Sequence, residues 1–200
     1  MVLFMGKEDD VIGLLDPKRE ILMNLEREFS KLKKNYSVLL MLKKEKYEEA
    51  YLELTKKLLA DFKNGIYITV NKESSELIDE MKEDGIDTSK IKFIDAVSEM
   101  VDDEGEEPKN ISFVSSPNEL VELEIAIGDA MEELNGGFLI FDSLTTLGVY
   151  NDEKRVEKFV HSLSQKTKSS KINDIFLVME HSKEEFVETV AQFFDNIIEL

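Results

Sequence analysis

Short apolar runs alternate along this chain with longer stretches in which apolar residues recur at helical spacing. Residues 138–141 read Phe-Leu-Ile-Phe with no polar position, as expected for a strand that is buried on both faces of a sheet. Strands that alternate with helices run mostly parallel, because each helix returns the chain to the end where the previous strand began. The pattern therefore predicts a doubly wound, mostly parallel sheet flanked by helices in a three-layer α/β/α fold. The predicted strands cover residues 36–42, 66–70, 91–94, 111–114, 138–141, 175–179 and 197–198.

Residues that cap helix ends mark several of the predicted helices. Asp16 before Pro17 predicts an N-cap with proline in the first turn, Asp152 can cap another helix, and Ser182 with Glu185 has the capping-box pattern. The predicted helices cover residues 17–34, 45–62, 73–83, a stretch opened by Ser116-Pro117 and closed at 135–137, residues 152–168, and a last stretch after Ser182.

The length and composition fit one domain. The chain has 200 residues, of which 42% are hydrophobic, enough for one sizeable core. We expect a single domain over residues 11–200, preceded by an apolar and acidic segment, residues 1–10, that could be flexible, add a strand or pack on a partner. We also expect residues 102–108, which are mostly acidic, to form a solvated connection.

The net charge of −18 argues against two classes of function. It disfavours binding to nucleic acid or to an anionic membrane surface, because both would be repelled at long range. The chain has no cysteine, which removes thiol chemistry and zinc-cysteine sites, and it has two histidines. The apolar runs have the length of strands, and residues 1–6 are too short for a signal peptide, so we expect a cytoplasmic protein.

The order of several short motifs resembles that of the RecA-like ATPases, most closely the KaiC-like branch found in many archaea. The resemblance covers residues 11–200 and implies the same parallel α/β fold, with Asp142 as the magnesium-side aspartate at the end of a buried strand. The motifs that carry it are Gly13-Leu14-Leu15-Asp16, the apolar run 38–42, Gly65-Ile66-Tyr67-Ile68-Thr69-Val70, Gly85-Ile86-Asp87, Phe93-Ile94-Asp95 and Phe141-Asp142-Ser143-Leu144.

Two positions that carry the chemistry of those ATPases do not match. No G-x-x-x-x-G-K-[ST] phosphate-binding loop occurs, and the first strand is followed by Lys43-Lys44-Glu45-Lys46-Tyr47, without a glycine. Where the family places a catalytic glutamate, this chain has Asn71-Lys72, and an amide cannot accept a proton from water. We therefore predict a degenerate loop, no catalytic residue and no cofactor.

Two candidate sites stay open beside this prediction. If a nucleotide or another anion binds, the residues to hold it are Lys43, Lys44, Lys46, Asp142 and Ser143. If a metal ion binds, its ligands are Asp142, Glu180 and His181, although we favour the interpretation that these three are polar residues at the ends of strands.

The sequence therefore favours a non-catalytic RecA/KaiC-like domain that acts through protein contacts as a regulatory or scaffolding subunit. Its partner would be an unknown protein or a second copy of the chain. The alternative is a sensor or ATPase that binds ATP or another anion in an altered pocket. Binding to nucleic acid is a third hypothesis, which the net charge disfavours.

Overall fold

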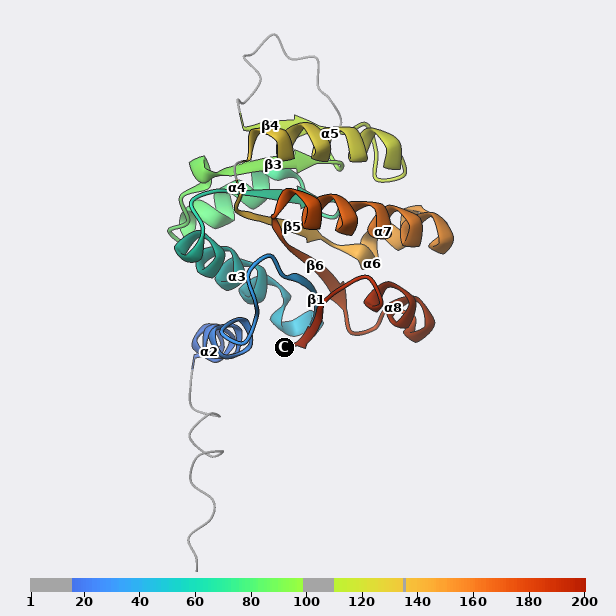
Figure 1. Ribbon diagram of the computed structural model, residues 1–200. Coiled ribbons are helices and arrows are strands. Elements are labelled where there is room, and N and C mark those ends of the chain that lie inside the picture. The colour runs from blue at the N-terminus through green and yellow to red at the C-terminus, as the bar shows by residue number, and fades with distance from the viewer. Residues whose placement is uncertain (1–15, 99–109, 135) are drawn as a thin grey trace, which may run out of the picture.

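The computed structural model describes residues 16–98, 110–134 and 136–200. Within these ranges seven parallel strands form one sheet with the order β4-β3-β2-β5-β6-β1-β7 (Figure 1). The predicted parallel α/β fold is confirmed, including the short edge strand at the carboxyl-terminal end of the chain. The strands are β1 (Ser37–Leu42), β2 (Gly65–Thr69), β3 (Ile91–Asp95), β4 (Ile111–Phe113), β5 (Phe138–Asp142), β6 (Asn173–Met179) and β7 (Asn196–Glu199).

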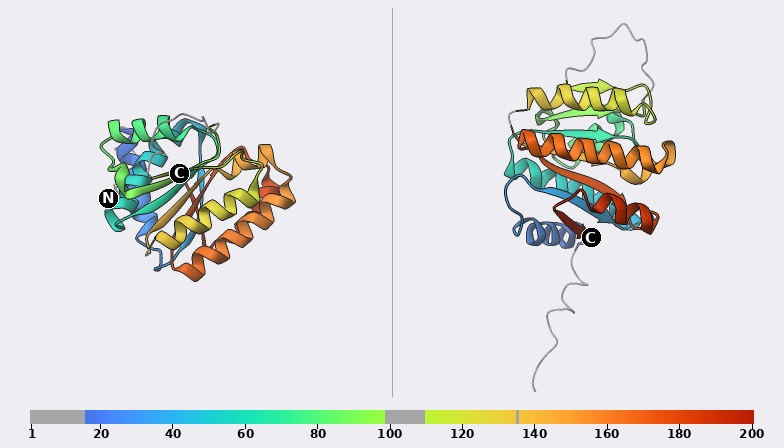
Figure 2. Two further views of the ribbon diagram at one scale, coloured as in Figure 1. Left: turned by 90° about the horizontal axis from the view of Figure 1, so that it is seen from above. Right: turned by 45° about the vertical axis from the view of Figure 1, so that its right-hand side comes forward.

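Helices cover both faces of the sheet and make it the middle of three layers (Figure 2, left). One face carries α2 (Pro17–Phe29), α3 (Tyr47–Asp61) and α4 (Ser74–Glu83). The other carries α5 (Leu120–Glu133), α6 (Leu144–Tyr150), α7 (Glu153–Ser170) and α8 (Glu184–Ala191).

Alternate residues of the central strands supply the two cores. In β5, Phe138 and Ile140 pack towards α2, α3 and α4, whereas Leu139 and Phe141 pack towards the helices of the other face. A strand that is buried on both sides needs apolar residues at every position, which explains the continuous apolar runs in the sequence.

Two of the three predicted helix caps are present. An Asp16 side-chain oxygen accepts a hydrogen bond of 3.2 Å from the Lys18 amide at the start of α2, and Asp152 accepts one of 3.0 Å from the Lys154 amide at the start of α7. The predicted capping role of Ser182 is wrong. The N-cap of α8 is Lys183, while the Ser182 hydroxyl pairs with that of Thr145 at 2.8 Å.

Several other predicted boundaries differ from the structure. The helix expected from Ser116-Pro117 starts at Leu120, because the preceding residues form a turn in which the Glu119 amide bonds the Ser116 carbonyl. The first helix ends at Phe29 rather than at residue 34. The sequence patterns did not predict α6.

Residues 1–10 and the acidic residues 102–107, for which we made separate predictions, lie outside the described residues. No helix in the described ranges has the length and apolar character needed to cross a membrane. All seven strands end at the same edge of the sheet because they run parallel. The residues that follow β1, β2, β5 and β6 are therefore brought to one edge, where such folds hold their ligands.

Candidate functional site

Asp142, the last residue of β5, lies buried at the carboxyl edge of the sheet between β2 and β6. The register of β2 and β5 pairs Thr69 with Asp142, which places Tyr67 two residues back on the neighbouring strand. The Tyr67 hydroxyl donates a hydrogen bond of 2.6 Å to Oδ2 of Asp142.

Two further donors occupy the other carboxylate oxygen of Asp142. The hydroxyl of Tyr47, the first residue of α3, donates to Oδ1, and so does the Asn71 side-chain amide at 3.1 Å. The same Asn71 nitrogen lies 2.6 Å from the Tyr47 hydroxyl, so the side chains of Tyr47, Asn71 and Asp142 are mutually bonded. Two phenols and one amide therefore occupy both carboxylate oxygens of this residue.

Burial sets the protonation behaviour of this cluster. It raises the pKa of Asp142 above the ordinary value for an aspartate, although the three donors act in the opposite direction. Burial and the neighbouring carboxylate also raise the pKa values of the Tyr47 and Tyr67 phenols, so both stay protonated and can donate.

A second polar cluster adjoins the first through aromatic contacts. Lys72 Nζ lies 2.6 Å from one carboxylate oxygen of Glu80 and 2.7 Å from the other, and the Tyr51 hydroxyl donates to Glu80 as well. Burial acts to raise the pKa of Glu80, but the bonds from Lys72 and Tyr51 outweigh it and lower the pKa. The Tyr51 ring packs against Tyr47 and Tyr67, with centroids 5.7 and 6.5 Å apart, and so connects the two clusters.

The loop after β1, which we predicted to be a degenerate phosphate-binding loop, does not have the backbone conformation of an anion-binding nest. Residues Lys44–Lys46 form one 3-10 turn, in which the Lys46 amide bonds the Lys43 carbonyl at 3.0 Å and the Tyr47 amide bonds the Lys44 carbonyl. No residue of the described segment 37–61 has a positive φ. Successive amides are therefore not turned towards a common point as they are in an anion-binding nest.

The structure does not bring the three candidate lysines together. Lys43 lines a cavity at the ends of β1, β6 and β7, Lys44 is exposed, and Lys46 Nζ lies 3.0 Å from a carboxylate oxygen of Glu20 in α2. Ser143 is buried, and its hydroxyl accepts a hydrogen bond of 3.3 Å from the Thr146 amide as the N-cap of α6. Within the described residues no hydrogen bond or salt bridge joins any of these lysines to Asp142 or to its neighbour Ser143.

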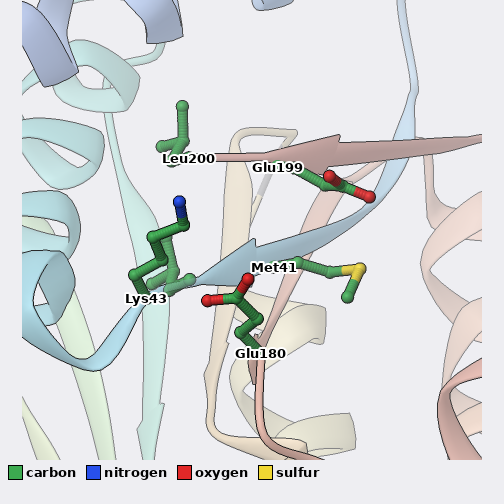
Figure 3. A pocket seen from close by; sticks show the side chains of 6 residues that line it. Met41, Lys43, Glu180, Glu199 and Leu200 are labelled. Atoms are coloured by element: carbon green, nitrogen blue, oxygen red, sulfur yellow. The ribbon is translucent and has the colours of Figure 1, made fainter. Parts of the chain in front are cut away.

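Glu180 and His181, two of the candidate metal ligands, are adjacent in sequence but line different cavities. Glu180 lines the cavity beside Lys43, which has a volume of about 390 Å³ and is surrounded by Met41, Glu199 and Leu200 as well (Figure 3). His181 lines a different cavity, of about 220 Å³, beside α6. Among residues 16–98, 110–134 and 136–200, no group of three or more histidine and carboxylate side chains has an arrangement that could hold a metal ion.

Sequence reasoning missed the three tyrosines that form these clusters. Tyr47 and Tyr51 lie in the second predicted helix at helical spacing with Leu54 and Leu58, and Tyr67 lies within a predicted strand that is mostly apolar. A tyrosine in such a strand is a usable signal, because a buried hydroxyl needs a hydrogen-bond partner. Both strands that pair with β2 end in an aspartate, Asp95 in β3 and Asp142 in β5.

The chain matches the model of one family and resembles solved structures of similar fold. The model of a family of unknown function (DUF7504) matches residues 40–200. The KaiC-like protein PH0186 from the hyperthermophilic archaeon Pyrococcus horikoshii is 15% identical, with a TM-score of 0.61, and the match covers 84% of this chain and 72% of that one. The uncharacterized protein PH0321 from the same organism, solved in complex with an unknown peptide, is 13% identical, with a TM-score of 0.67 and coverage of 88% and 82%.

No curated protein matched the chain. The similarity to PH0186 shows a KaiC-like fold.

Proposed function

The chain belongs to DUF7504, a family of unknown function, and we propose that it is a non-catalytic KaiC-like domain that acts through protein contacts as a regulatory or scaffolding subunit. The observation that carries the proposal is the closure of Asp142 by Tyr47, Tyr67 and Asn71. In a nucleotide-binding relative the equivalent carboxylate would face the magnesium ion, which normally relies on substrate phosphates as well.

Opening this cluster for a magnesium ion would be costly. Both phenols would have to leave a buried carboxylate, and each unsatisfied buried partner costs about 1–3 kcal/mol. The amides of the loop after β1 would also have to break the bonds of the 3-10 turn before they could face a phosphate. The rearrangement would thus oppose nucleotide binding at two places at once.

The rival proposal, an ATP or anion sensor that uses Lys43, Lys44, Lys46, Asp142 and Ser143, has one favourable observation. A cavity of about 390 Å³ opens beside Lys43 at the edge of the sheet. Its other charged side chains are the carboxylates of Glu180 and Glu199, so the lining carries more negative than positive charge. This balance favours a cation over a phosphate and makes the rival the weaker proposal.

Titration calorimetry of the full chain with ATP and magnesium distinguishes the non-catalytic proposal from the sensor. We expect no heat of binding and no shift in melting temperature, while a KaiC-like ATPase with an intact loop binds under the same conditions. A micromolar dissociation constant would end the non-catalytic proposal. Ligand-dependent stabilisation that disappears in Asp142→Ala would support the sensor instead.

Protein contacts are the remaining part of the proposal. The peptide bound to PH0321 is compatible with it, because a protein of this fold can hold a polypeptide segment. Self-association is included, and light scattering at micromolar concentrations tests it. A monomer at every concentration would restrict the proposal to unlike partners.

A further inference from the structure

The outer side of α5 exposes two large aliphatic residues on consecutive turns. Val121 is 71% exposed and Ile125 is 59% exposed, and their spacing of four places them on one stripe of the helix. Single exposed aliphatic residues are common on protein surfaces, but a stripe of them beside a groove is typical of a contact site.

A groove of about 350 Å³ lies between α5 and α7, which run side by side on the same face of the sheet (Figures 1 and 2). Leu120 and Phe159 line it and are themselves buried, while Val121, Arg155 and Lys158 line it from exposed positions. The groove thus has an apolar floor and a basic side formed by α7.

The basic side is unusual in a chain with a net charge of −18. Arg155 and Lys158 are three residues apart on α7, and among the described residues no carboxylate forms a salt bridge with either of them. The one carboxylate that lines the groove, Glu124, already lies 3.9 Å from Lys166. Two cations therefore adjoin an apolar surface without a salt-bridge partner in the described part of the chain.

Gly128 lies on the same stripe as Val121 and Ile125. A Cβ built at this position would meet no atom of the described structure within 4 Å, so nothing there requires glycine in the middle of the helix. Glycine destabilises a helix relative to alanine. Its one clear advantage here is that another backbone can approach α5 closely.

We propose that the groove between α5 and α7 binds an amphipathic helix of a partner protein whose apolar face is flanked by carboxylates. The proposal rests on the proposed function and names the surface that would carry the protein contact. Two parallel helices form a seat for a third, and carboxylates of the partner would compensate Arg155 and Lys158. A second copy of the chain fits less well, since both molecules carry the same large negative charge.

Two synthetic helical peptides with the same leucine stripe test the proposal on the full chain. One carries glutamates beside the stripe and the other carries lysines at the same positions, and fluorescence anisotropy reports binding. The net charge of the protein favours the lysine peptide, whereas the groove favours the glutamate peptide. We expect the glutamate peptide to bind at least about tenfold more tightly than the lysine peptide. Its binding should weaken as salt is added.

Variants at exposed positions locate the binding. Val121→Asp should weaken binding of the glutamate peptide at least about tenfold, and so should the double change of Arg155→Glu with Lys158→Glu. The double change should also strengthen binding of the lysine peptide. Val149→Asp is the matched control, because Val149 is 78% exposed but lies on α6, outside the groove lining.

Three outcomes would overturn the proposal. They are a preference for the lysine peptide, no binding of either peptide at millimolar concentration, and a self-association that Val121→Asp abolishes, which would assign the groove to a second copy. A parallel titration with ATP and magnesium on the same sample separates failure of this proposal from failure of the proposed function.

Discussion

The Tyr67 hydroxyl donates a hydrogen bond of 2.6 Å to Oδ2 of Asp142 from the strand that pairs with that of the aspartate. Both residues are buried, and no other donor in the described residues reaches this oxygen. The bond therefore stabilises a carboxylate at the point where a nucleotide-binding relative would need it exposed. The Tyr67 ring is fully buried in the core, so it cannot move away without disturbing the packing around it.

Tyr67→Phe should destabilise the protein by about 1–3 kcal/mol, because it leaves a buried carboxylate oxygen without its donor while keeping the ring. Urea denaturation at pH 7 measures the change. Tyr150→Phe is the matched control, since Tyr150 is 54% exposed, and we expect a change within about 0.5 kcal/mol. Equal stability of the Tyr67 variant and the wild type would show that the bond contributes nothing.

Asp95→Asn should also destabilise the protein, and with a particular dependence on pH. The buried Asp95 carboxylate accepts hydrogen bonds from the amides of Ser74, Val97 and Ser98 and from the Ser98 hydroxyl, at 2.7–2.9 Å. Burial acts to raise its pKa, but these donors outweigh it and lower the pKa. An asparagine would direct an NH₂ group at a donor, which costs about 1–3 kcal/mol at pH 7.

The direction of this pH dependence follows from the depressed pKa of Asp95. The stability that its charged form contributes is present above the unfolded pKa, near about 4, and is lost as the pH falls through the lower pKa of the folded state. The deficit of Asp95→Asn should therefore shrink below about pH 4. Asp79→Asn, at an exposed position of α4, should show no such deficit at any pH. A deficit of Asp95→Asn that stays constant down to pH 2 would contradict this account.

Asp174→Asn should show the opposite pH dependence. Asp174 is buried at the start of β6, where Thr167 donates to one oxygen and Lys168 and Asp195 lie nearby, and burial raises its pKa to about 6. For this group the uncharged form is favoured on folding, so its contribution is present below the unfolded pKa and is lost as the pH rises to about 6.

Asp174→Asn removes this pH-dependent loss of stability, because an asparagine side chain does not ionise. Relative to the wild type, Asp174→Asn should become more stable by up to about 3 kcal/mol between pH 4 and pH 6 and keep that difference at pH 7. Denaturation midpoints over this range check it, with Asp79→Asn again as the exposed control. If Asp174→Asn instead lost stability relative to the wild type as the pH rises, the charged form of Asp174 would be compensated in the folded protein.

The strands could be predicted because a sheet buried on both faces imposes continuous apolar runs, as in residues 138–141 of β5. The caps at Asp16 and Asp152 could be predicted because they depend only on neighbouring amides. Helix α6 could not, since it has seven residues, buries only Leu144 and Leu147, and includes a glycine and two threonines, which are weak helix formers.

The candidate site was predictable only in part. The position of Asp142 at the sheet edge follows from its place after an apolar strand. Its bonds with Tyr47 and Tyr67 depend on the register of β2 with β5 and on how α3 is rotated over the sheet. Neither the register nor the rotation can be predicted from a local sequence pattern. Glu180 and His181 are adjacent in sequence but line separate cavities, which a strand-end argument does not distinguish.

Two glycine-to-alanine changes should act in opposite directions. Gly137 has a φ of +117°, and a Cβ there would lie 2.4 Å from the Asn64 carbonyl oxygen, so Gly137→Ala forces both backbone strain and a clash. We expect a loss of more than about 2 kcal/mol. Gly128→Ala meets no atom within 4 Å in the described structure and should raise stability by about 0.5–1 kcal/mol through helix propensity.

Thermal and urea denaturation of both variants measure the difference. If Gly128→Ala also weakens binding of the glutamate peptide, the glycine contributes to binding at the groove between α5 and α7 rather than to the fold. The change stabilises the helix but adds a methyl group on its outer side. Loss of stability in Gly128→Ala would instead mean that α5 requires the glycine for its own packing.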